Sequence, residues 1–146
     1  MKTPILAAFA LTIAAGPALA AGDAAKGAQD FMKCKACHSI IKDDGTAIVK
    51  GGILGPNLYG VIGRPAASGK RANNGQPFTY GPGLKELGQK GVVWTEDLVA
   101  EYVKNPTAFV KSHTGDAAAR SNMAFMLSQG GEDVAAYLAS VGPAAK

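Results

Sequence analysis

The stretch between His38 and Trp94 is dense in turn-forming residues, and this feature limits the possible folds of the chain most strongly. Glycine adjoins proline, aspartate or asparagine every few residues, a pattern that interrupts helices and strands. The turn signals are Asp43-Asp44-Gly45, Gly51-Gly52, Gly55-Pro56-Asn57, Gly63-Arg64-Pro65, Asn73-Asn74-Gly75 and Gly81-Pro82-Gly83. A loop region this long is uncommon inside a compact domain unless something else organises it. A large buried prosthetic group would do so.

Three helices are expected around this loop region. Asp23 is placed to cap the first, which runs over 24–34 with small or apolar residues at helical spacing. The second covers 95–105 and is ended by Pro106. The third starts near residue 131 and carries an amphipathic stripe through residue 141.

The composition favours one glycine-rich domain built from helices. A length of 146 residues suits a single domain, and 47% apolar with 18% charged residues excludes a disordered chain. Runs of Ile, Val and Thr are few, which argues against a sheet protein. The polar, alanine-rich segment 111–122 is expected to be a surface excursion. The predicted fold class is therefore all-α and loop-rich.

The first twenty residues (1–20) are expected to be a cleaved export signal. A positively charged start is followed by the apolar stretch 5–15 and by the small-x-small pattern Ala18-Leu19-Ala20. The apolar stretch has about half of the ~20 residues that a membrane-spanning helix needs. We therefore expect cleavage before Ala21, which leaves a single soluble domain, residues 21–146, in the periplasm.

Both cysteines of the chain lie in the short motif Cys34-Lys35-Ala36-Cys37-His38. This C-x-x-C-H pattern is typical of haem c attachment, because two thiols one helical turn apart reach the two vinyl groups along one porphyrin edge. The adjacent imidazole then lies under the iron. A thioredoxin-like motif would follow a strand, whereas this one ends a helix. A zinc site would need two ligands besides the cysteines, and only His38 and His113 remain. We therefore predict one haem c, bound covalently through Cys34 and Cys37.

An iron with six ligands needs a second axial ligand opposite His38. Met123 and Met126 both lie far downstream, and their spacing alone leaves either as the ligand with the other packed in the core. Met32 precedes the cysteines on the first helix and is expected to point away from that side. His113 lies in a polar stretch and is expected to be a solvated loop residue.

With these residues in order, the sequence resembles the class I cytochromes c, and specifically the bacterial cytochrome c2 and c-550 proteins. The matching segments cover essentially the whole mature chain. They are Gly22-Asp23-Ala24-Ala25-Lys26-Gly27, Cys34 to Ser39, Gly55-Pro56-Asn57-Leu58-Tyr59-Gly60-Val61-Ile62-Gly63-Arg64, Trp94, Glu101-Tyr102-Val103-Lys104-Asn105-Pro106, Met123-Ala124-Phe125 and Glu132-Asp133-Val134-Ala135-Ala136-Tyr137-Leu138. The resemblance implies the class I cytochrome c fold, an all-α and loop-rich chain wrapped around one covalently attached haem.

The resemblance also implies how the iron is held. His38 and Met123 would be the two axial ligands, and Met126 would become a packing residue. The carbonyl of Pro56 would accept a hydrogen bond from the His38 imidazole and so fix its ring. The crossing between the first and last helices would be formed by Gly27, Phe31 and Tyr137.

Further residues would hold the rest of the haem. By the resemblance, Arg64, Tyr80 and Trp94 correspond to residues that bind the buried propionates, and Tyr102 with Ser121 would form hydrogen bonds near the axial sulfur. Taken without the resemblance, Trp94 and Tyr102 are interpreted as ordinary core aromatics, and Arg64 as a solvated turn residue.

Two departures from the family pattern concern docking. Relatives commonly carry lysines on both sides of the axial methionine, whereas the flanks 121–122 and 126–129 have none here. The insertion 68–76 has no firm register with the relatives. Cleavage of the signal leaves 14 basic and 11 acidic residues. Any electrostatic steering of docking must therefore come from the uneven distribution of these charges rather than from the small net charge.

The expected function is that of a one-electron carrier and not of an enzyme. Ligation of both axial positions leaves no place for a substrate at the iron. The resemblance implies a shuttle, docking transiently as a monomer, from a quinol–cytochrome c oxidoreductase to a cytochrome oxidase or a photosynthetic reaction centre. No nucleic acid and no membrane span are expected. The alternative is a haem peroxidase or gas-binding sensor, which would need an open iron position.

Overall fold

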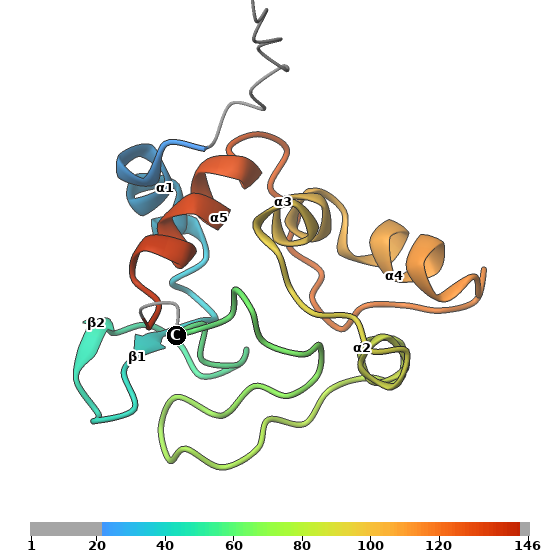
Figure 1. The fold of residues 1–146 in the computed structure, drawn as a ribbon, viewed down its shortest axis with the longest axis horizontal. Helices are drawn as coiled ribbons and strands as arrows, with labels where there is room; N and C mark the ends of the chain where they lie inside the picture. The colour runs from blue at the N-terminus through green and yellow to red at the C-terminus, as the bar shows by residue number, and fades with distance from the viewer. Residues whose placement is uncertain (1–21, 144–146) are drawn as a thin grey trace, which may run out of the picture.

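The computed structural model describes residues 22–143, so the expected export signal, residues 1–20, lies outside the described residues. The elements are α1 (Ala24–Asp30), the 3-10 turn η1 (Phe31–Lys33), β1 (Ile40–Ile41), β2 (Ala47–Val49), α2 (Pro82–Gln89), α3 (Glu96–Lys104), α4 (Pro106–Thr114) and α5 (Gly131–Ser140). Helices form the upper and right parts of the molecule in Figure 1, and loops form the lower part. The predicted helical, loop-rich fold is confirmed. Within 22–143, each helix is too short or too polar to cross a membrane.

The first and last helices cross in close contact, as predicted. A Cβ atom at Gly27 on α1 would collide with the Asp133 carbonyl oxygen and lie 2.8 Å from the Tyr137 Cβ, so only glycine fits there. Beside this crossing the rings of Phe31 and Tyr137 pack with their centroids 5.7 Å apart. The backbone N–H of Asp23 donates to an Asp133 carboxylate oxygen at 2.7 Å, which holds the start of α1 on α5.

A short antiparallel hairpin, β1–β2, is not expected from the sequence. It forms because the turn residues 43–45 close it: Gly45 has a φ of +84°, and the Asp44 carboxylate accepts the Thr46 N–H at 2.8 Å. The side chain of Asn57 then binds both backbone groups of Ile41, accepting its N–H at 2.9 Å and donating to its carbonyl at 2.7 Å. The hairpin is thereby tied to the loop that follows it.

Two helices replace segments for which the sequence predicts turn or surface structure. Gly81-Pro82-Gly83 is predicted to be a turn, but Pro82 starts α2 at a position where the missing N–H costs nothing. Pro106 ends α3 and also starts α4, because the Asn105 side chain caps the new helix by accepting the Ala108 N–H at 3.0 Å. The predicted surface excursion 111–122 is therefore helical through its first four residues.

Helix bounds elsewhere follow the caps. The first helix stops at Asp30 and continues as η1, so the cysteine motif occupies a turn and not the last helical residues. Thr95 caps α3 as predicted, accepting the Leu98 N–H at 3.2 Å. The insertion 68–76 forms a closed turn in which the Arg71 N–H donates to the Gln76 carbonyl at 2.7 Å.

Candidate functional site

The two cysteines lie in the turn between η1 and β1. Cys34 is buried and Cys37 half-buried, and both thiols are free. The N–H groups of Cys37 and His38 both donate to the Cys34 carbonyl, at 3.1 and 3.0 Å, which fixes the turn. Burial raises the pKa of the Cys34 thiol to about 11. A redox-active thiol has a lowered pKa, so this environment disfavours the thioredoxin-like alternative.

The imidazole of His38 is held in one tautomer. Its Nδ1 lies 2.8 Å from the Pro56 carbonyl oxygen. A carbonyl can only accept, so Nδ1 carries the proton and Nε2 keeps a free lone pair. Burial lowers the pKa of His38, while the Pro56 hydrogen bond opposes that shift. The ring is therefore neutral at physiological pH and has the form that binds a metal.

The loop 51–55 lies directly against the motif. The Gly52 N–H donates to the Lys35 carbonyl at 2.9 Å, and the Gly55 N–H donates to the Cys37 carbonyl at 2.8 Å. A Cβ atom at Gly55 would collide with Cε1 of His38, so glycine is required beside the ring. The sequence marks Gly55 as a turn residue, and only the structure reveals its contact with the imidazole.

Met123 is half-buried and anchored through its backbone. Its N–H donates to Ser121 Oγ at 3.1 Å, and that hydroxyl shares a hydrogen bond of 2.7 Å with the Tyr102 hydroxyl. Burial raises the pKa of Tyr102, and the Ser121 hydrogen bond opposes the shift. Tyr102 therefore stays neutral and holds the loop that carries Met123.

The expectation that Met126 packs in the core is wrong. Its side chain is 57% exposed, whereas its neighbour Leu127 is buried. The reason is the hydrogen bond of 2.7 Å from the Leu127 N–H to the Val103 carbonyl, which turns Leu127 inward and Met126 outward. Met32 on η1 is also exposed.

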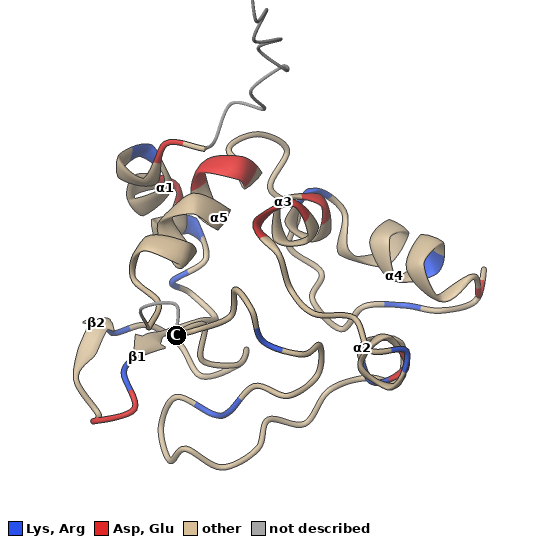
Figure 2. Cartoon of the chain, viewed as in Figure 1, with Lys and Arg blue, Asp and Glu red and all other residues tan. Residues whose placement is uncertain are grey.

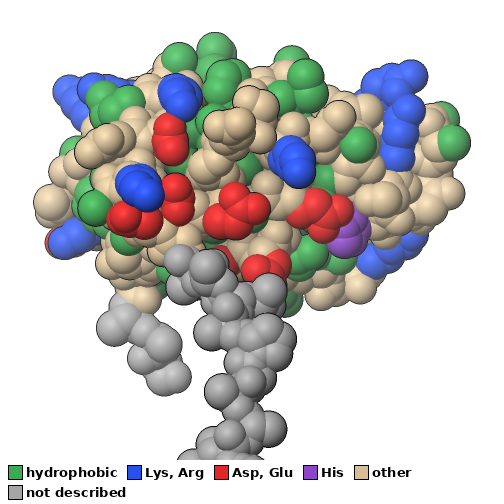
Figure 3. Space-filling view, turned by 90° about the horizontal axis from the view of Figure 1, so that it is seen from above, with side chains coloured by type: hydrophobic (Ala, Val, Ile, Leu, Met, Phe, Trp, Pro, Cys, Tyr) green, Lys and Arg blue, Asp and Glu red, His purple; other side chains and the backbone are tan. Residues whose placement is uncertain are grey.

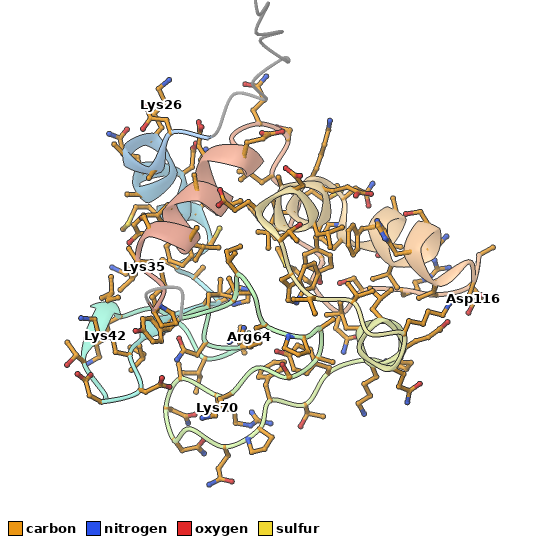
Figure 4. All side chains as sticks on the ribbon, viewed as in Figure 1. Lys26, Lys35, Lys42, Arg64, Lys70 and Asp116 are labelled. Atoms are coloured by element: carbon orange, nitrogen blue, oxygen red, sulfur yellow. The ribbon has the colours of Figure 1, made fainter. Side chains whose placement is uncertain are left out.

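Arg64 and Tyr80 come together from distant points of the loop region. The Arg64 guanidinium donates to the carbonyls of Asn57 at 3.1 Å and Tyr59 at 3.3 Å, and the Tyr80 hydroxyl accepts the Gly69 N–H at 3.1 Å. A Cβ at Gly69 would touch both side chains. Burial lowers the pKa of Arg64 and raises that of Tyr80. Arg64 is thus no solvated turn residue: it lies toward the middle of the molecule, whereas Lys70 lies on the outer loops (Figure 4).

An aromatic cluster connects Trp94 to the helices. The Trp94 ring lies 5.2 Å from that of Tyr102 and 5.6 Å from that of Phe109, measured between centroids.

The expectation that His113 is a solvated loop residue is wrong, because it lies on α4 and not in a loop. Its ring stacks on Phe109 at 4.0 Å, and its Nε2 is 3.2 Å from both carboxylate oxygens of Glu101.

The hydrogen bond between Tyr102 and Ser121 can be tested by removing one hydroxyl. We expect Tyr102→Phe to lower the free energy of unfolding by about 1 kcal/mol, because a part-buried hydrogen bond is lost while the ring packing stays. Chemical denaturation measures this. Tyr137→Phe removes a hydroxyl outside this set of bonds and is the control. Equal losses in the two variants would show that the bond to Ser121 contributes nothing.

The donor set suits a haem c and not a bare metal ion. Two free thiols adjoin an imidazole whose Nε2 lone pair is available, and a thioether is anchored on a separate loop. Among residues 22–143 the structure places no three His, Cys, Asp or Glu side chains together as ligands for a metal ion.

Comparisons with known proteins settle the family. No family model matches the chain. Cytochrome c2 of Rhodobacter capsulatus is 53% identical over 142 residues, which cover 97% of this chain and 98% of the relative. The chain belongs to the bacterial cytochrome c2 family. Cytochrome c-550 of Paracoccus versutus is 47% identical over 146 residues, covering 98% of this chain and 91% of that protein.

The solved structures give the same result. The structure of cytochrome c2 from Rhodobacter capsulatus has a TM-score of 0.75 to this one at 55% sequence identity, and the match covers 82% of this chain and 98% of that one. The class I cytochrome c fold is thus confirmed. As a member of the cytochrome c2 family, the chain carries one haem c, bound through Cys34 and Cys37.

Proposed function

We propose that this protein carries single electrons in the periplasm, from a quinol–cytochrome c oxidoreductase to a cytochrome oxidase or a photosynthetic reaction centre. The observation that supports this most directly is the neutral imidazole of His38, fixed by Pro56 beside two free thiols. Membership of the cytochrome c2 family supports the coarser statement that the protein is a cytochrome c electron carrier.

Different residues of the chain are proposed to make different contacts with the haem. Cys34 and Cys37 would form the two thioethers, and His38 Nε2 and the Met123 sulfur are proposed as the side-chain atoms that would bind the iron. Haem c supplies a reversible one-electron couple when bound, and a thioether ligand favours the ferrous form. The further residues proposed to bind it, through hydrogen bonds and packing, are Pro56, Arg64, Tyr80, Trp94 and Tyr102.

The anchoring of Met123 favours a carrier over a peroxidase or gas sensor. Those proteins need an open iron position, whereas the Met123 loop is held by the hydrogen bonds from Met123 to Ser121 and from Ser121 to Tyr102. Electron transfer needs no nucleophile and no proton donor, so the residues of the site have only to hold the ligands still between the two redox states.

Export and covalent attachment are tested by the mass of the periplasmic protein. We expect a chain that begins at Ala21 and carries one haem, which acid–acetone does not extract, because the signal is removed and the thioethers are covalent. Mass spectrometry of the periplasmic fraction gives both results. A mass that shows only an internal disulfide would overturn the proposal.

The charges of the chain are unevenly distributed, which supports docking to a partner through the loop side. Acidic side chains gather at α1, α3 and α5 (Figure 2), on the face seen from above in Figure 3. The acidic residues of these three helices and of the α1 N-cap are Asp23, Asp30, Glu96, Asp97, Glu101, Glu132 and Asp133. From Gly45 to Lys85 the chain has basic residues and no acidic one. Such asymmetry orients a protein toward a partner of opposite charge.

Electron-transfer rates test which basic residues dock. We expect Lys35→Glu to slow transfer to an isolated acceptor complex more than Lys85→Glu, because Lys35 lies inside the cysteine motif. Lys85 lies on α2, away from that motif in the sequence. Stopped-flow rates across a salt series decide this, since salt screens charges beyond about 8 Å at physiological ionic strength. Rates that change neither with the two substitutions nor with salt would mean that these charges are solvated and take no part in docking.

A further inference from the structure

Two aliphatic side chains project into solvent directly beside the cysteine motif. Leu54 is 79% exposed and Ile53 is 51% exposed, and Leu54 is the most exposed large apolar side chain among residues 22–143. A single exposed leucine needs no explanation. An adjacent pair at a fixed position beside the redox motif does, because folding gains nothing from leaving it in water.

The backbone holds this pair outward. Hydrogen bonds flank it, from the Gly52 N–H to the Lys35 carbonyl and from the Gly55 N–H to the Cys37 carbonyl. On the same segment, Ser39 Oγ donates to the Gly52 carbonyl at 3.0 Å and accepts the Gly51 N–H at 3.0 Å. Cβ atoms at Gly51 and Gly52 would collide with carbonyl oxygens of the motif segment. The pair cannot turn into the core without breaking these contacts. The segment is therefore ordered before a partner binds, and binding costs little further conformational entropy.

The surroundings of the pair are basic. Lys35 accepts the Gly52 hydrogen bond through its own carbonyl, and Lys50 precedes Gly51 in the chain. Lys35 and Lys42 lie on the side of the molecule that carries the hairpin (Figure 4). Asp43 and Asp44 at the hairpin turn lie beside Lys42 and offset its charge, whereas residues 45–85 contain no acidic side chain, so Lys35 and Lys50 are the cations that flank the pair. A complementary surface is therefore apolar at its centre and acidic at its rim.

We propose that Ile53 and Leu54 form an apolar anchor that inserts into a depression on the membrane-bound quinol–cytochrome c oxidoreductase, with carboxylates at its rim facing Lys35 and Lys50. This inference rests on the proposed electron-carrier function. Docking through the anchor brings the partner against the segment that is hydrogen-bonded to Cys37. One electron passes from the partner, which is oxidised, to this protein, which is reduced, and no bond or proton is exchanged.

The test uses the haem-loaded Leu54→Ser protein and the isolated quinol–cytochrome c oxidoreductase in lipid nanodiscs. We expect the second-order rate constant of reduction to fall by about fivefold and the affinity, measured by surface plasmon resonance, to fall by a similar factor. The rate at saturation should be unchanged, as should the optical spectrum and the reduction potential. Because apolar contacts are not screened, the loss should persist at high salt, unlike that of Lys35→Glu.

The control is Val93→Ser, which removes an apolar side chain of 43% exposure next to Trp94 and the acidic start of α3. It should bind like the wild type. Wild-type rates and affinity in Leu54→Ser would overturn the anchor alone. Failure of the wild-type protein to accept electrons from the complex would overturn the proposed function as well. Equal binding of the wild type to protein-free nanodiscs, lost in Leu54→Ser, would overturn the anchor because the pair would then contact lipid.

Discussion

The haem-loaded Met123→Ala variant is expected to lose the weak near-infrared charge-transfer band of an iron–sulfur bond, whereas Met126→Ala retains it. The structure separates the two methionines, because Met126 is turned into solvent while Met123 is anchored to Ser121. Loss of the thioether should also lower the reduction potential by on the order of 100 mV or more, since the axial ligand sets much of its value. Optical and electrochemical titrations measure both effects.

Azide binding provides an independent readout of the same substitution. An iron that has lost its sixth ligand should bind azide readily in Met123→Ala and poorly in the wild type and in Met126→Ala. Loss of the band in Met126→Ala instead would mean that the ligand assignment is wrong. The segment that carries both methionines would then be shifted by about one helical turn.

The second large effect is expected from Gly55→Ala. The added methyl group would collide with Cε1 of His38, so either the ring or the loop must move and the hydrogen bond to Pro56 is lost. We expect a loss of about 2–4 kcal/mol in the free energy of unfolding and a changed visible spectrum of the haem-loaded protein. Denaturation curves and optical spectra measure the two effects.

Gly45→Ala is the matched control for this substitution. Gly45 has a φ of +84°, and apart from its two neighbours in the chain no residue has an atom within 4 Å of the position that an added methyl group would occupy. Alanine there therefore costs only backbone strain of about 1–2 kcal/mol. Its spectrum should equal that of the wild type. If Gly55→Ala also kept the wild-type spectrum, the contact with His38 would not govern the imidazole.

The sequence predicts those features that depend on residues close together in the chain. The caps Asp23 and Thr95 locate the starts of α1 and α3, because capping is decided within four residues of chain. The cysteine motif and the Pro56 partner of His38 are likewise predictable, the second by resemblance to the cytochrome family. The close approach at Gly27 follows from the same resemblance.

Long-range contacts account for what the sequence does not predict. Pro106 is recognisable only as a helix end, because its role as the first residue of α4 depends on the Asn105 cap. The outward side chain of Met126 depends on the hydrogen bond from Leu127, in the loop between α4 and α5, to Val103 on α3. Spacing along the chain carries no information about such a partner, so the two methionines are equivalent from the residues alone.

The side chain of Asn57 couples the hairpin to the loop that follows it. It binds both backbone groups of Ile41, and the Leu58 N–H donates to the Ser39 carbonyl at 3.0 Å. Any fluctuation that frays the hairpin therefore also releases the loop that carries the Pro56 carbonyl. We therefore expect the two to open together as one cooperative unit, in the sense used for hydrogen exchange. The basicity of the His38 ring is thus protected by the local stability of a hairpin whose two strands contain two and three residues.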